Sequence, residues 1–189
     1  MSTSGYHHGD LRAACLRAAL ELLEEGGATA LSLRAVARRA GVAPSAPYRH
    51  YADRDALLSA VAAVGYRQLA ERLAAAHPSP STPEDLAAVA VAYVRFALDQ
   101  PALFRVMFGE PCDRDSSERV AATTAISAYV TAIVARCFPD SDAEAMSTAV
   151  WALVHGLAFL HLDGKLDATR PRIVSKRVRG AVRAALAAG

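Results

Sequence analysis

Few residues in this chain are of the types that hold disulfide frameworks or metal centres together. The three cysteines, Cys15, Cys112 and Cys137, are odd in number and far apart, so they match neither a disulfide scaffold nor a metal-ligand spacing. The sequence also lacks a Gly-rich phosphate loop, a nucleophile elbow and a Cys/His cluster. These absences speak against an enzyme, and we expect no cofactor, no catalytic residues and no metal site.

Targeting signals and an excess of charge are missing as well. The start of the chain has no apolar core preceded by positive charge, and the longest unbroken apolar runs fall well short of the roughly 18–20 residues that cross a bilayer. The net charge is only +2 over 189 residues. A balance this close to neutral does not by itself predict a polyanionic partner, so any basic surface must be local. We expect a soluble, cytoplasmic protein.

What the sequence does contain is helical periodicity along its whole length. The composition is 53% hydrophobic and 21% charged, which is typical of a globular chain, and no alternating strand pattern interrupts it. Asp10 is the expected cap of a first helix that ends at the Gly26–Gly27 pair, and Ser32 is the expected cap of a short helix that stops at Gly41. Further helices are expected at about 54–76, 84–99, 101–108, 116–137, 142–163 and 171–187.

Four polar-tipped side chains, Tyr48 to Tyr51, stand side by side directly after the second helix. We expect them on a helix of two turns at most, with Ser45 as N-cap and Pro47 in the first turn. Two short helices joined by a turn at Gly41 form a helix-turn-helix signature, in which the second helix enters the DNA major groove. Tyrosine, histidine and arginine then bind backbone phosphates. The alternative is that Tyr48 and Tyr51 are core aromatics beside a solvated Arg49, and Tyr51 also suits a buttressing role.

Residues 6–65 resemble the N-terminal DNA-binding domain of the TetR-type family of transcriptional regulators, through "YHHGDLR" and "ALSLRAVARRAGVAPSAPYRHYADRDALLSAV". The resemblance implies a homodimeric repressor whose larger helical domain binds a small molecule. It places Tyr48 and His50 at phosphate-contact positions and Arg54 where the family usually has lysine. Two departures from the family pattern are Ala43, where a serine is frequent, and Pro47 within the recognition helix. The predicted DNA-binding residues are Ser32, Arg34, Ser45, Ala46, Tyr48, Arg49, His50 and Arg54.

The segment 142–163 is apolar on two opposite sides when drawn as a helix, so both sides are expected to be buried. One side would face its own domain and the other a partner subunit. The last predicted helix, 171–187, carries a second apolar stripe. These two helices of each chain, doubled by a two-fold axis, form a four-helix bundle. The alternative is an intramolecular bundle in a monomer. The predicted dimer-interface residues are Met146, Val150, Leu153, Leu157, Leu160, Val174, Val178 and Val182.

The same segment carries Trp151, His155 and Gly156, which resemble the Trp…His-Gly (WHG) pattern of one subgroup of TetR-type C-terminal domains. Bulky apolar side chains with a few polar tips suit an apolar or aromatic ligand, although the same spacing is also typical of an ordinary helical core. The predicted ligand-binding residues are Tyr66, Phe96, Phe104, Met107, Phe108, Tyr129, Trp151 and His155, and Tyr93 is a further candidate.

The fold prediction is all-α with about nine helices, divided into a three-helix helix-turn-helix module with a short N-terminal arm (1–53) and a larger helical bundle for ligand binding and dimerisation (54–189). The predicted function is that of a ligand-responsive transcriptional regulator, a homodimeric repressor released from its operator by a small molecule. The expected partners are double-stranded operator DNA, a second copy of the chain and an apolar or aromatic effector, with no membrane. The alternative is a constitutive DNA-binding repressor whose C-terminal domain only dimerises.

Overall fold

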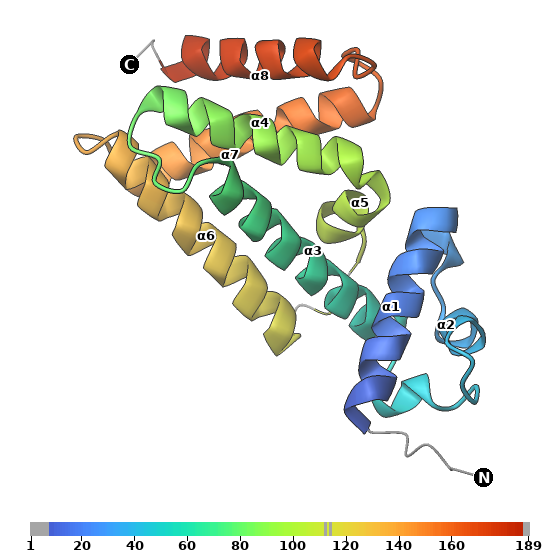
Figure 1. Cartoon of the computed structure of the whole chain (residues 1–189). Coiled ribbons are helices and arrows are strands. Elements are labelled where there is room, and N and C mark those ends of the chain that lie inside the picture. The colour runs from blue at the N-terminus through green and yellow to red at the C-terminus, as the bar shows by residue number, and fades with distance from the viewer. Residues whose placement is uncertain (1–7, 112, 114, 187–189) are drawn as a thin grey trace. The chain divides into compact units, whose positions relative to one another are not determined.

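The computed structural model describes residues 8–111, 113 and 115–186, and all of its regular structure in these ranges is helical (Figure 1). The prediction of an all-α fold is confirmed, and the eight α-helices of the described residues are close to the nine expected. They are α1 (His8–Gly26), α2 (Leu33–Arg39), α3 (Arg54–Ala76), α4 (Pro83–Asp99), α5 (Pro101–Gly109), α6 (Ser117–Cys137), α7 (Ala143–Leu162) and α8 (Pro171–Leu186), with 3-10 turns η1 (Ala28–Ala30) and η2 (Pro47–Arg49).

The chain folds as two compact units. The first comprises the residues up to Gly65 together with Ala102–Ala121, and the second comprises Tyr66–Pro101 together with the chain from Ala122 onward. The helix α3 contributes residues to both units. The predicted division between residues 53 and 54 stays a prediction. The first residues of the "YHHGDLR" segment, the N-terminal arm and Cys112 lie outside the described residues.

Local capping signals set most helix ends where the sequence predicts them. The Ser32 hydroxyl accepts a hydrogen bond from the Ala35 amide at 3.1 Å, which caps α2. The Asp53 carboxylate accepts from the Ala56 amide at 2.8 Å at the start of α3. The predicted cap at Asp10 is wrong, because α1 already begins at His8. The backbone of Asp10 therefore lies within the first turn of the helix.

The core of the first unit is built on one face of α1. Leu11, Cys15 and Leu23 from this helix are buried, and Tyr51 and Leu58 are buried in the same unit. Burial raises the pKa of the Cys15 thiol, so that this side chain stays neutral and packs as a small apolar group.

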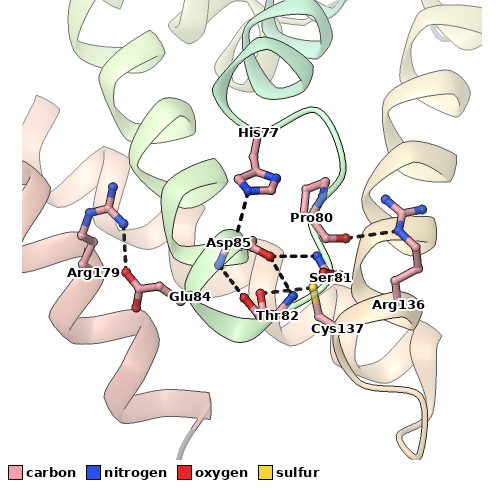
Figure 2. A network of polar contacts seen from close by, with 9 residues as sticks. All are labelled: His77, Pro80, Ser81, Thr82, Glu84, Asp85, Arg136, Cys137 and Arg179. Carbon is pink, nitrogen blue, oxygen red and sulfur yellow. Dashed lines mark hydrogen bonds and ion pairs between the residues drawn. The ribbon is translucent and has the colours of Figure 1, made fainter.

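In the second unit, α4 packs against both α7 and α8 (Figure 1). A capping box fixes the start of α4: the Thr82 hydroxyl accepts from the Asp85 amide at 3.2 Å, and the Asp85 carboxylate accepts from the Thr82 amide at 3.0 Å (Figure 2). The same carboxylate accepts from the Ser81 amide, and these N–H donors lower the pKa of Asp85. The capping box thereby fixes the residue at which α4 begins.

The loop before α4 is also tied to the end of α6 (Figure 2). Arg136 donates from Nε to the Pro80 carbonyl at 3.2 Å, and the Cys137 thiol donates to the Thr82 carbonyl at 3.4 Å. The Nε2 atom of His77 lies 3.2 Å from Oδ1 of Asp85. The Arg136 contact gives the Pro80 carbonyl a partner, whereas the Thr82 carbonyl also accepts from the Leu86 amide of α4 at 3.1 Å.

Two helices, α6 and α7, are long and apolar enough to cross a membrane when judged by length and composition alone, and the pair α4–α5 would be a third if taken as one span. The expectation that no segment reaches this length is wrong by this measure. The expectation rests on unbroken apolar runs. In α6 and α7 these runs are interrupted by uncharged serine, threonine, tyrosine and histidine, which lower the mean hydropathy of each helix only slightly. Both helices lie within the helical fold, and less than a third of the apolar 18-residue stretch of each helix is buried inside the chain.

The contact between α3 and α5 requires a glycine. A Cβ atom at Gly65 would lie 2.5 Å from Sδ of Met107 and 3.1 Å from Cγ of Leu103. Gly65→Ala is expected to lower the free energy of unfolding by about 1–3 kcal/mol through overpacking, although alanine is the better helix former.

The matched control is Gly180→Ala in α8, where an added Cβ meets no atom within 4 Å. This variant should be as stable as the wild type or more stable. Urea denaturation followed by circular dichroism measures both changes, and equal stability of the two variants would contradict the packing argument.

Candidate nucleic-acid interface

The first half of the interface is α2, which presents one apolar and one basic face. The apolar face of α2 is buried within the first unit and consists of Leu33, Val36 and Ala37. Arg34 and Arg38, one helical turn apart, are both exposed on the opposite side. With Ser32 capping the helix start, α2 offers a short cationic surface on a rigid support.

The turn after α2 is a Schellman motif centred on Gly41. The Val42 amide donates to the Ala37 carbonyl at 3.0 Å, and the Gly41 amide donates to the Arg38 carbonyl at 3.3 Å. Gly41 has a φ of 67°, in the left-handed region that residues with a Cβ rarely adopt. The prediction that this glycine makes the sharp turn of a helix-turn-helix is confirmed.

The segment that follows is shorter than expected. It is the 3-10 turn η2, which is within the limit of two turns, and Ala46 is its N-cap without a side-chain hydrogen bond, so the predicted cap at Ser45 is wrong. Pro47 occupies the first turn as predicted, but neither Pro44 nor Pro47 has an N–H to donate. The amides of Arg49 and His50 bond to the third residue before them, which is the 3-10 pattern, and the Tyr51 amide bonds to the Pro47 carbonyl at 3.0 Å.

Two tyrosines at the ends of this segment have opposite environments. Tyr48 is 51% exposed, whereas Tyr51 is 2% exposed. The Tyr51 hydroxyl reaches the Arg12 carbonyl at 3.5 Å, and burial raises its pKa. Tyr51 is thus a core residue that supports the segment, and Tyr48 is available for an external partner.

Ion pairs within the unit decide which arginines remain available. Arg39 pairs with Glu21 and with Glu25, and this contact lowers the pKa of Glu25. Arg12 pairs with Glu118. In contrast, no carboxylate in the described part of the unit pairs with Arg34, Arg38 or Arg49. Arg34 and Arg38 of α2 and Arg49 of η2 are therefore the arginines of this interface without a carboxylate partner in the described part of the unit.

The remaining predicted contacts are placed as follows. Ser45 is exposed and Ala46 is half-buried, next to Tyr48 in the chain. His50 is half-buried, and its Nε2 atom has no hydrogen-bond partner within the described residues. Arg54 donates to the carbonyls of Leu31 at 3.1 Å and Ala28 at 2.8 Å, so its guanidinium is engaged inside the protein. A DNA contact by each of these residues stays a prediction.

Arg38 is not among the predicted DNA-binding residues, although the sequence pattern of α2 turns it toward water or an anionic partner. A signal existed, because Arg38 follows Arg34 by four residues on a helix whose cap and end were both predicted, which places the two on one face.

The predicted ligand-binding residues are divided between the units. Phe104, Met107 and Phe108 belong to the first, and the rings of Phe104 and Phe108 are 4.7 Å apart. Tyr66 and Phe96 are buried in the second unit, like Phe104 and Met107 in the first. These four side chains fill apolar cores, as the alternative anticipated, and a ligand contact by them stays a prediction.

Trp151 and His155 lie with Phe159 in one row on α7, which we call the α7 aromatic row. The ring centroids of Trp151 and His155 are 5.8 Å apart, and those of His155 and Phe159 are 4.9 Å apart. Oη of Tyr93, from α4, shares a 2.9 Å hydrogen bond with Nδ1 of His155. Burial lowers the pKa of His155, and it raises the pKa of Tyr93 well above its ordinary value. Both partners are therefore uncharged at neutral pH. Tyr129 is half-buried, and its hydroxyl has no partner in the described chain.

The predicted dimer residues fall mainly on the inner side of their helices. Five of them are buried inside their own unit, where they join α7 and α8 to α4; these are Val150, Leu157, Val174, Val178 and Val182. Met146 and Leu153 are half-buried, and Leu160 is 44% exposed. The outer side of α7 instead presents Trp151, which is 50% exposed, and small residues. Which of these residues meet a partner subunit stays a prediction.

Two segments of the chain match models of one protein family. Residues 16–61 match the model described as bacterial regulatory proteins, tetR family. Residues 86–185, more than half of the chain, match the model described as tetracyclin repressor-like, C-terminal domain. The chain belongs to the TetR family.

Individual relatives agree with this assignment. A protein of unknown function from Rhodococcus sp. RHA1 has a similar structure with a TM-score of 0.78, 35% identity, and coverage of 95% of this chain and 97% of that chain. A tetR-family regulatory protein from Rhodococcus RHA1, 23% identical, shares the fold with a TM-score of 0.67 and coverage of 92% and 95%. An HTH-type transcriptional regulator from Mycobacterium tuberculosis is 34% identical over 120 residues, which are 60% of this chain and 51% of the relative. The chain thus spans about half the length of the curated relatives it matches.

The single tryptophan of this TetR-family chain reports directly on the α7 aromatic row. A protonated imidazole quenches a neighbouring indole, so the emission of Trp151 should rise as the pH rises through the pKa of His155. Because burial lowers that pKa, the midpoint should lie below the ordinary value of about 6.5.

Fluorescence titration between mildly acidic and neutral pH measures this step, with His155→Gln as the control that should abolish it. A midpoint at or above the ordinary histidine value, or a step that persists in His155→Gln, would contradict the environment described for His155.

Proposed function

We propose that this TetR-family protein is a DNA-binding transcriptional regulator that acts as a homodimeric repressor and responds to a small molecule. The observation that carries the proposal is the surface of α2 and η2. Arg34, Arg38 and Arg49 have no carboxylate partner in the described part of this unit, and the exposed Tyr48 lies beside them in the helix-turn-helix segment. A cationic helix-turn-helix surface with an exposed hydroxyl is suited to the phosphates of a duplex.

In this proposal η2 enters the major groove and α2 lies across the backbone. Tyr48 and His50 donate hydrogen bonds to phosphates, and the arginines supply charge. Ser45 and Ala46 are small, so the backbone of the turn approaches base edges or thymine methyl groups closely. Pro47 restricts the turn to one shape, which lowers the entropy lost on binding.

The homodimer is proposed from the outer surface of α7. Trp151 and Leu160 are large exposed apolar side chains, and Ala149, Ala152 and Gly156 between them are exposed and small. A contiguous apolar surface of this kind is typical of an interface, and small residues let two helices approach closely. A two-fold protein also matches the two half-sites of a palindromic operator.

The effector is proposed to be an apolar or aromatic molecule that contacts the α7 aromatic row. The rings offer stacking surfaces, and the hydrogen-bonded pair of Tyr93 and His155 offers a polar group in a largely apolar environment. Trp151 and His155 of this row, together with Gly156, also form the Trp…His-Gly pattern, which supports assignment to the WHG subgroup. Such a molecule changes operator affinity only if it binds one state of the protein more tightly than the other. The continuous helix α3, which contributes to both units, is the proposed link.

The second candidate is a constitutive repressor whose C-terminal unit only dimerises. The full burial of Phe96, Phe104 and Met107 favours it, because these side chains already have apolar neighbours. Its operator affinity would be the same whichever small molecule is added. We further propose that the protein acts in the cytoplasm, where its DNA partner is found.

DNA binding is tested with the duplex upstream of the coding region of this protein. Tyr48→Ala should bind at least tenfold more weakly, and its stability should change by no more than about 0.5 kcal/mol, because Tyr48 is exposed. Arg34→Ala should weaken binding and reduce the slope of log affinity against log salt by about one.

The control for charge is Lys165→Ala, which removes one positive charge from an exposed site in the second unit. Fluorescence anisotropy at two salt concentrations measures all three variants. Unchanged binding by both Tyr48→Ala and Arg34→Ala would refute the assignment of α2 and η2 as the DNA-contacting surface.

The dimer is tested by placing a charge in the outer surface of α7. Ala152→Arg should raise the dimer dissociation constant at least tenfold, because a buried unpaired charge is costly at an interface. Ala75→Arg is the matched control, since Ala75 is an exposed alanine on α3. Sedimentation equilibrium measures both, and a dimer that tolerates Ala152→Arg would place the interface elsewhere.

A further inference from the structure

The helix α8 is unusual in its charge, and the function proposed above makes no use of it. It contains five cations and no carboxylate over Pro171–Leu186. Its inner face is formed by the buried Val174, Val178 and Val182. The four cations Arg172, Lys176, Arg179 and Arg183 are spaced by four, three and four residues, so they lie on one face of the helix.

This row of charge borders a hollow. A groove of about 510 Å³ runs between α8 and α4, and we call it the α4–α8 groove. It is an open groove lined mainly by α8, with the four cations of the row, and by Arg95 from α4, so that five positive side chains from two helices border it. Both helices belong to the second unit and lie side by side (Figure 1).

One carboxylate, that of Glu84, neutralises the part of the groove at Arg179 and Arg183, and the rest of the groove stays positively charged. Glu84 accepts from Arg179 at 3.1 Å and from Arg183 at 2.7 Å, and Figure 2 shows the first of these contacts. Within the described residues, no carboxylate pairs with Arg95, Arg172 or Lys176. Like charges one turn apart on a helix repel, so this row reduces the stability of α8 unless an anion lies between its members.

We propose that the α4–α8 groove binds a small molecule that carries a phosphate or diphosphate group, held by Arg95, Arg172 and Lys176. Arginine forms paired hydrogen bonds with phosphate oxygens, and lysine adds a compact charge. Three cations match the two to three negative charges of such a group at neutral pH. The volume of the groove is typical of sites for small ligands, and a concave surface encloses a small anion better than a duplex.

This site is distinct from the α7 aromatic row, and it does not depend on DNA binding by the first unit. A ligand that bridges Arg95 of α4 and Arg172 of α8 would stabilise the packing of these helices, because it binds the folded arrangement and not the unfolded chain.

The test uses the full chain with inorganic pyrophosphate and ATP as probes, and sodium sulfate at matched ionic strength as the comparison. Isothermal titration calorimetry should show saturable binding of pyrophosphate or ATP, with sulfate at least tenfold weaker. Arg172→Gln/Lys176→Gln should weaken probe binding at least tenfold, and so should Arg95→Gln, which lies on the other helix. The matched control, Arg67→Gln/Lys165→Gln, removes the same charge from exposed positions outside the groove and should stay within twofold of the wild type.

A gain-of-affinity variant separates this site from general charge attraction. Glu84→Gln removes the carboxylate that competes for Arg179 and Arg183, so it should bind the probes several-fold more tightly. Circular dichroism and the Tm of each variant without ligand establish that it is folded, and loss of the repelling charges should leave the Tm unchanged or higher.

Two results would overturn the proposal. One is equal binding of pyrophosphate, ATP and sulfate by the wild type and the groove variants. The other is loss of affinity for a non-specific duplex in Arg172→Gln/Lys176→Gln while pyrophosphate and ATP binding is absent or unchanged, which would make the groove a nucleic-acid surface.

Discussion

The pairing of arginine with carboxylate decides where this nearly neutral chain is positively charged. In the first unit, carboxylates of α1 hold Arg39, while Arg34 and Arg49 remain unpaired within its described part. In the second unit, Glu84 holds two cations of α8, and Arg172 is left without a carboxylate. With a net charge of +2, a few such pairs determine whether a surface is basic or neutral. Both candidate anion-binding surfaces contain arginines with which no carboxylate of the described residues pairs.

Backbone constraints then give the first of these surfaces its shape. Gly41 closes α2 in a left-handed conformation, and the next segment is a 3-10 turn that begins at Pro47. Tyr51 anchors that turn in the core, so that Tyr48 three residues earlier is presented outward. The helix-turn-helix of this chain is thus a rigid turn supported by one aromatic side chain, and the helical second element expected from the pattern is replaced by a more compact one.

Local sequence signals were sufficient for the helices and insufficient for the faces that they bury. The caps at Ser32 and Asp53 and the full extent of α3 followed from residue types next to one another in the chain. For α7, the helical pattern showed two apolar sides and could not say which one packs against the same chain. The structure buries Val150 and leaves Trp151 exposed, and it is the packing of α4 and α8 against α7 that makes this choice.

The sequence by itself determined the all-α fold, the helix-turn-helix with its glycine turn and the likeness to TetR-type regulators, since each depends on spacing and residue type over short distances. The tertiary structure decided which arginines are free, because ion pairs such as that between Glu84 and Arg183 join residues far apart in the chain. It also decided that Arg95 joins the cations of α8, and that Tyr93 binds His155. Side chains on different helices meet only when those helices pack, and no local pattern records that meeting.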